Sequence, residues 1–223
     1  MKTVKLFVEG GGDSKSLRTE CRAAFSSFLL KSGLSGFMPR VIASGSRNSA
    51  YSDYCAAILN GELAVLLVDS ETEIILPTDD LSFDIDNPRT WKPWHHLLHR
   101  QGQTGEVADP WKKPSAAVDD DCHLMVQLME SWYLADITAM KEYFGNGFNE
   151  RALPNRTDIE NIPKDTVLAS LHEATKNTRK GSYNKGNHAF GILAVIDPNK
   201  VKDKSPWAKR FVTLLSEKMQ GVR

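Results

Sequence analysis

The fold is decided by a run of five apolar residues that ends at an acid: Ala64-Val65-Leu66-Leu67-Val68-Asp69. A continuous apolar run of this kind is typical of a parallel strand that is covered on both faces. Residues 3–8 form a similar run, which ends at Glu9. Between the two lie a helical pattern, another apolar run at about residues 37–43, and a second helical pattern at about residues 49–59. This alternation predicts parallel strands joined by right-handed crossovers.

The pattern changes after the third predicted strand. Residues 70–118 are rich in Pro, Asp and Trp and predict a long insertion. Residues 124–129 form a fourth apolar run, which is either a strand or the start of a buried helix. Residues 137–223 show mainly helical spacing, with a strong helix start at Ser205-Pro206. We therefore expect one α/β domain over residues 1–223, with a parallel sheet flanked by helices, an insertion and a helical C-terminal third.

Composition limits the class of protein. The chain has 28 basic and 28 acidic residues, so its net charge of zero argues against binding nucleic acid by bulk charge alone. A neutral chain also offers little electrostatic resistance to association, including self-association. The three cysteines, Cys21, Cys55 and Cys122, are far apart and suggest reduced thiols in the cytoplasm. No segment approaches the ~20 apolar residues of a membrane span. We expect a cytoplasmic protein that does not bind membranes.

Acidic residues follow the predicted strands at the edge where open parallel sheets bind ligands. Glu9 ends the first strand and Asp69 the third, and Glu71 points the same way if the chain stays extended. Glu130 and Asp136 lie near the same edge if the fourth apolar run is a strand. Carboxylates that share a site repel one another unless a cation lies between them, and oxygen ligands favour Mg²⁺ or Mn²⁺. Alternatively, these acids only cap helices and solvate loops.

Basic residues provide candidate contacts to phosphate. Arg47 follows the second predicted strand on the same edge, although a solvated loop arginine would look the same. The best basic patch is formed by Lys176, Arg179, Lys180 and Lys185, with Tyr183 and His188 interleaved. Such a mixture suits phosphate contact and base stacking, or simply a solvated loop. The glycine-rich turn at residues 10–16 lacks the spacing of a P-loop, so we do not expect ATP hydrolysis.

The insertion contains clustered tryptophan and histidine. Trp91 and Trp94 indicate either a contact surface for a partner protein, where aromatic residues are enriched, or ordinary packing. His95 and His99 could share one helix face, but the glutamate of H-E-x-x-H is missing. A zinc site is therefore not expected in this segment.

Several stretches resemble known families. Val8-Glu9-Gly10 and Asp69-Ser70-Glu71 resemble the glutamate and D-x-D/E elements of the TOPRIM fold of topoisomerases, primases and overcoming-lysogenization-defect (OLD) nucleases. The later stretches resemble a bacterial RloG-like family of TOPRIM-like proteins that is often found beside ATPases in defence islands. These stretches are Asp120–Gln127, Met129–Asp136, Tyr183–His188 and Ser205–Phe211. The resemblance spans nearly the whole chain.

The resemblance implies a metal-dependent nuclease. Glu9 would be a metal ligand or general acid/base, and Asp69 and Glu71 would be metal ligands. Glu71 stands where Asp is frequent, so the ion's position would shift. Glu130 is a fourth candidate ligand, and Lys185 is counted with the first three as a candidate catalytic residue. The implied substrate is DNA or RNA, and the implied partner is an ABC/AAA-type ATPase in anti-phage defence.

Two other functions fit the same residues. In the first, the chain is a non-catalytic binding or regulatory subunit of such a complex, and its acidic edge is structural. In the second, it performs phosphoryl transfer or a phosphatase-like reaction on a small nucleotide. Metal-dependent cleavage of polynucleotides separates the nuclease from both.

Overall fold

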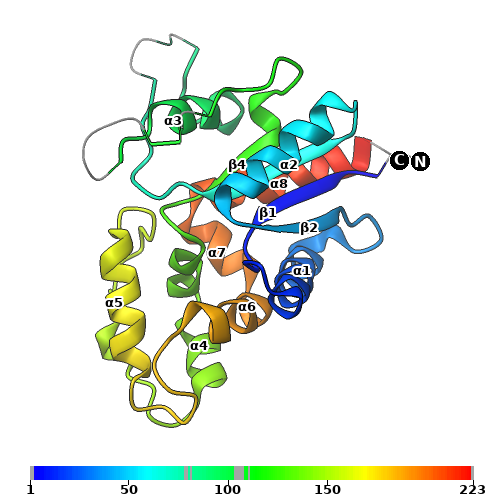
Figure 1. The fold of residues 1–223 in the computed structure, drawn as a ribbon. Coiled ribbons are helices and arrows are strands. Elements are labelled where there is room, and N and C mark those ends of the chain that lie inside the picture. The colour runs from blue at the N-terminus through cyan, green and yellow to red at the C-terminus, as the bar shows by residue number, and fades with distance from the viewer. Residues whose placement is uncertain (1–2, 78–79, 81, 103–107, 110, 222–223) are drawn as a thin grey trace.

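A computed structural model describes residues 3–77, 80, 82–102, 108–109 and 111–221 (Figure 1). Within them, four strands form one parallel sheet in the order β2-β1-β3-β4. The strands are β1 (Lys5–Glu9), β2 (Arg40–Gly45), β3 (Ala64–Asp69) and β4 (Cys122–Met125). The predicted α/β class is confirmed, and the fourth apolar run begins as a strand. Parts of the predicted domain and insertion (residues 1–2, 78–79, 81, 103–107, 110 and 222–223) lie outside the described residues.

The described part of the chain also contains eight α-helices. They are α1 (Lys15–Leu29), α2 (Arg47–Leu59), α3 (Pro93–His99), α4 (Ile137–Phe144), α5 (Lys164–Thr175), α6 (Lys185–Val195), α7 (Pro198–Lys204) and α8 (Pro206–Gly221). The helical C-terminal third is confirmed. The segment Met129–Ala135 forms 3₁₀ turns, which are tighter than those of an α-helix. Among the described residues, no helix is both long and apolar enough to cross a membrane.

The sheet lies between two apolar layers. Leu6 and Val8 of β1 point into a core covered by α1, α6 and α8, whereas Phe7 points into a second core under α2 and the insertion. Successive side chains of a strand point to opposite faces, so a strand buried on both faces must be apolar at nearly every position. Each fully buried side chain of this kind contributes about 1.5–3 kcal/mol. This double burial explains the continuous apolar runs in the sequence.

The insertion belongs to the second core. Trp91, Trp94 and Trp111 are only 4–6% exposed and pack with α2 and the strands. His96 is fully buried, and its ring nitrogens pair with the Ser70 carbonyl at 2.9 Å and the Ile75 amide at 3.1 Å. Of the two interpretations of the Trp-rich segment, the structure confirms ordinary packing.

Arg210 of α8 joins the C-terminal helix to β4 and the insertion. Its side chain is fully buried and donates hydrogen bonds to the carbonyls of Pro88, Cys122 and Asp119 at 2.8–2.9 Å. A further bond at 3.0 Å reaches Nδ1 of His123. A buried charge is tolerated only when its donors are paired, so these bonds fix where the end of the chain packs.

Replacing Arg210 tests this arrangement. We expect Arg210→Met to lower the free energy of unfolding by roughly 3–5 kcal/mol, because the buried carbonyls lose their donor. Lys209→Met changes an exposed neighbour on the same helix and should have little effect. Urea denaturation of the three proteins measures the difference. An Arg210→Met protein as stable as the Lys209→Met protein would contradict the assignment.

Candidate metal centre

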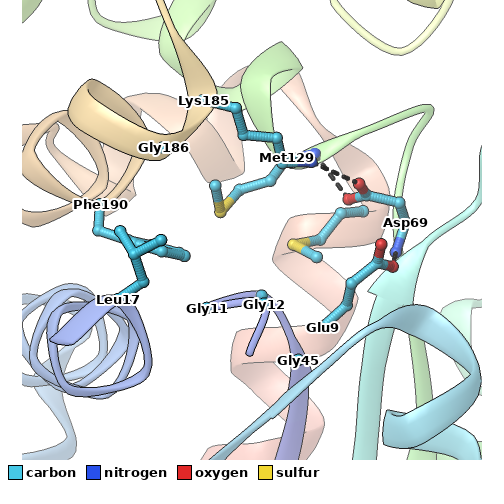
Figure 2. A pocket seen from close by; sticks show the side chains of 12 residues that line it. Glu9, Gly11, Gly12, Leu17, Gly45, Asp69, Met129, Lys185, Gly186 and Phe190 are labelled. Carbon is cyan, nitrogen blue, oxygen red and sulfur yellow. Dashed lines mark hydrogen bonds and ion pairs between the residues drawn. The ribbon is translucent and has the colours of Figure 1, made fainter. Parts of the chain in front are cut away.

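Three carboxylates meet at the carboxyl edge of the sheet. Glu9 ends β1, Asp69 ends the neighbouring β3, and Glu71 follows two residues later. One oxygen atom from each lies within 4.8 Å of the other two. The Asp69 amide donates to Glu9 at 3.3 Å, and the Met129 amide donates to the Asp69 carboxylate at 2.8 Å. Figure 2 shows Glu9 and Asp69 side by side at one end of a pocket. The predicted acidic cluster exists and could hold a metal ion.

The route by which Glu71 reaches the cluster differs from the expectation of an extended chain. Its backbone is in the left-handed region, with φ of 69°. This conformation costs a non-glycine residue roughly 1–2 kcal/mol. Two bonds hold it: the Glu71 amide donates to the Gln127 carbonyl at 2.7 Å, and the Gln127 side chain accepts from the Lys164 amide at 3.1 Å. The bend turns the Glu71 side chain toward the other two acids.

Burial and like charge act on this cluster together. Asp69 is 2% exposed, and burial raises its pKa well above the usual range, with the neighbouring charge of Glu9 adding to the effect. Burial also raises the pKa of Glu9, and Glu71 contributes in the same direction. Lys185 opposes the shift in both cases. A cation among the three oxygens would remove the repulsion that raises these pKa values.

Lys185 places a positive charge opposite the acids. Its Nζ lies 3.7 Å from Asp69 and 3.7 Å from Glu130, and its side chain is 55% exposed. Partial burial acts to lower the pKa of Lys185, but the surrounding carboxylates outweigh this and raise it. Lys185 is the first residue of α6, and Asn184 caps that helix by accepting from the Gly186 amide. The predicted catalytic lysine is therefore charged and adjacent to the cluster.

Glu130 lies near Lys185 and is not one of the three clustered carboxylates. It is fully buried, and one oxygen accepts from the Tyr183 hydroxyl at 2.8 Å. Its other oxygen has no hydrogen-bond partner among the described residues. Glu130 thus contacts the site through Lys185, and its role as a metal ligand stays a prediction. Asp136 instead caps α4 and pairs with Lys200 at 2.6 Å.

Arg47 contacts the backbone of Asp69 next to the cluster. It is 8% exposed, its Nε donates to the Asp69 carbonyl at 3.1 Å, and its Nη1 pairs with Asp109 at 3.0 Å. The guanidinium also stacks over Trp111, 4.1 Å from the ring centroid. Its Nη2 has no hydrogen-bond partner among the described residues but is buried, so the contact between Arg47 and phosphate stays a prediction.

The remaining basic patch is only partly available to a ligand. Arg179 and Lys180 are exposed in the loop before α6, and Lys180 lies over the Tyr143 ring at 3.6 Å. Tyr183 and His188 were considered either for stacking with bases or as part of a solvated loop, but they are only 9% and 6% exposed. They pack inside the helical layer, because Tyr183 bonds to Glu130 and His188 packs against ring neighbours. The stacking role of these two rings is therefore wrong.

Sequence reasoning missed Lys164 and the apolar part of the site. Lys164, at the start of α5, forms an ion pair with Glu71 although 93 positions separate the two residues. Leu17 and Phe190, on α1 and α6, line the pocket beside the acids. Nothing local in the sequence signals these contacts, since each depends on how distant helices pack.

A known protein family matches almost the same residues that the structure describes. A profile described as "Domain of unknown function (DUF4276)" matches residues 8–216. The chain belongs to this family. The residues matched to the DUF4276 profile include Glu9, Asp69, Glu71 and Lys185. No curated protein and no solved structure matches the chain.

Asp69→Asn tests the electrostatics of the cluster. Because the folded-state pKa of Asp69 is raised, its contribution to wild-type stability is present at low pH and is lost as pH rises through that pKa. The metal-free variant should therefore gain stability relative to wild type as the pH rises above the range in which an unfolded aspartate titrates.

Thermal unfolding at several pH values, with and without Mn²⁺, measures the stability difference and the effect of the metal ion. Mn²⁺ should raise the melting temperature of wild type and have little effect on Asp69→Asn, which has lost a charged ligand. Asp53→Asn, an exposed acid on α2, is the matched control. A stability difference that does not change with pH would contradict the raised pKa of Asp69.

Proposed function

We propose that this protein is a metal-dependent nuclease of the TOPRIM type that acts on DNA or RNA. The main support is the group of three carboxylates within 4.8 Å at the carboxyl edge of a parallel sheet. An all-oxygen ligand set suits Mg²⁺ or Mn²⁺, with Glu9, Asp69 and Glu71 as ligands. When bound, such an ion would polarise a phosphodiester oxygen and activate water.

The chain's own residues would orient and protonate the reacting groups. The Met129 amide holds the Asp69 carboxylate, so that its position does not depend on side-chain rotation alone. Glu9 is half-buried with a raised pKa, which would suit its alternative role as a group that accepts and returns a proton. Lys185 would donate to a phosphate oxygen, because half of its side chain is exposed and its charge is maintained.

Contacts to the rest of the substrate would come from the loop before α6. Arg179 and Lys180 are exposed there, a few residues before Lys185. A strand whose phosphate lies at Lys185 could run past both side chains. Such phosphate contacts would position the strand without reading its sequence.

The proposed partner is a cytoplasmic ATPase in anti-phage defence. This proposal rests on the sequence resemblance. Two of the resembling stretches meet in space, since Tyr183 donates to Glu130 beside Lys185. The zero net charge of the chain presents no electrostatic barrier to such a complex.

One observation favours the non-catalytic alternative. Lys164 already pairs with Glu71, and Lys185 lies near Asp69, so lysines partly neutralise the cluster without an ion. In a purely structural role, substitution of Glu9 or Asp69 would change stability but no reaction.

Cleavage assays separate the two. Plasmid, single-stranded DNA and RNA are incubated with the protein in Mg²⁺ or Mn²⁺, with and without a co-expressed ATPase. We expect metal-dependent cleavage that falls by about 100-fold or more in Glu9→Ala and Asp69→Ala, since each removes a ligand of the reacting centre. Glu73→Ala, an exposed acid close to Glu71, is the matched control. Absence of cleavage under every condition would refute the nuclease, and cleavage insensitive to both substitutions would refute the site.

A further inference from the structure

A pocket of about 210 Å³ opens directly beside the acidic cluster. Its polar end is formed by Glu9, Asp69 and Lys185. The rest of its side-chain lining is apolar: Leu17, Met125, Met129 and Phe190. A phosphate and its ion need only the polar end, so the apolar end is left for another part of the ligand.

The shape of the apolar end is set by α1, α6 and a glycine turn. Figure 2 shows Leu17 and Phe190 close together, across the pocket from Asp69, with Met129 between. Gly10, Gly11, Gly12 and Gly45 also line the pocket. A Cβ added at Gly10 would lie 3.1 Å from both the Phe190 ring and the Cys21 sulfur. A side chain at this position would crowd the ring that lines the pocket.

We propose that this pocket receives one unpaired nucleobase of the nucleotide whose phosphate lies at the acidic cluster, an inference that rests on the proposed function. Pockets for drug-sized ligands are usually ~300–1,000 Å³, so the smaller volume here leaves space at the apolar end for one ring system. Apolar and aromatic walls stack on the face of any base, which favours little discrimination among bases. The flexible thioethers of Met125 and Met129 adapt to rings of different size.

The consequence is a preference for single-stranded or unpaired substrates. A base inside a duplex could enter only after leaving its stack, which costs a few kcal/mol. A single strand or a free nucleotide does not have to break base pairs. Every substrate would place a phosphate at the acidic end, so the preference for unpaired bases would come from the apolar end.

Binding measurements test the pocket without turnover. The probes are a fluorescent oligothymidylate of about twelve nucleotides, a fully abasic strand of the same length, and a duplex containing the first strand. Anisotropy is measured with Ca²⁺ replacing Mg²⁺. We expect the abasic strand and the duplex to bind about tenfold or more weakly than the single strand.

Two tryptophan substitutions on α1 provide the matched variants. Leu17 is only partly exposed and lines the pocket, so Leu17→Trp should fill it and weaken single-strand binding about tenfold or more. Ala23→Trp adds the same side chain at an exposed position and should bind as wild type does. Thymidine monophosphate, tested as a competitor, shows whether a free nucleotide also enters the pocket.

The outcomes distinguish this inference from the nuclease proposal. Equal binding of abasic, duplex and single-stranded probes, or identical behaviour of Leu17→Trp and Ala23→Trp, would overturn the base pocket even if Glu9 and Asp69 prove essential for cleavage. A selective loss in Leu17→Trp would support the pocket even if no cleavage is found. If thymidine monophosphate competes at the same concentration as the unlabelled strand does, the base pocket is supported and its ligand is a free nucleotide.

Discussion

Mutual repulsion among Glu9, Asp69 and Glu71 is the constraint around which this end of the molecule is built. Their oxygens lie within 4.8 Å of one another, and the charged forms of Glu9 and Asp69 are disfavoured by burial. Parallel pairing of β1 with β3 brings the first two together. Lysines approach from two different helices: Lys185 lies near Asp69, and Lys164 pairs with Glu71. The lysines partly offset the repulsion, and a cation among the three oxygens would remove it.

The insertion contributes to the same support through residues that lie well beyond Glu71 in the sequence. It covers the second face of the sheet with buried tryptophans. It also contacts the chain directly after β3, because His96 pairs with the Ser70 carbonyl. Asp109 holds Arg47, whose Nε in turn bonds to the Asp69 carbonyl. Packing in this layer and the position of the acids are therefore coupled.

Several features of the structure could not be predicted from the sequence. The fourth apolar run was compatible with a strand or a helix, and only pairing of β4 with β3 decides between them. Glu71 was expected on an extended chain, but its bond to Gln127, which in turn accepts from Lys164, holds a bend there. Tyr183 looked available for stacking, yet its hydroxyl pairs with the buried Glu130. Each miss involves a partner far away in the chain.

The alternation of strands and helices, the double burial of the sheet and the acids at the ends of β1 and β3 can all be read from the amino-acid sequence. These features depend on side-chain periodicity and on residues next to one another, which are local properties. The tertiary structure alone decided that Lys164 reaches Glu71, that Glu130 stands behind Lys185, and that Leu17 and Phe190 line one pocket. These contacts depend on how α1, α5 and α6 pack against the sheet edge, and no short stretch of sequence encodes that packing.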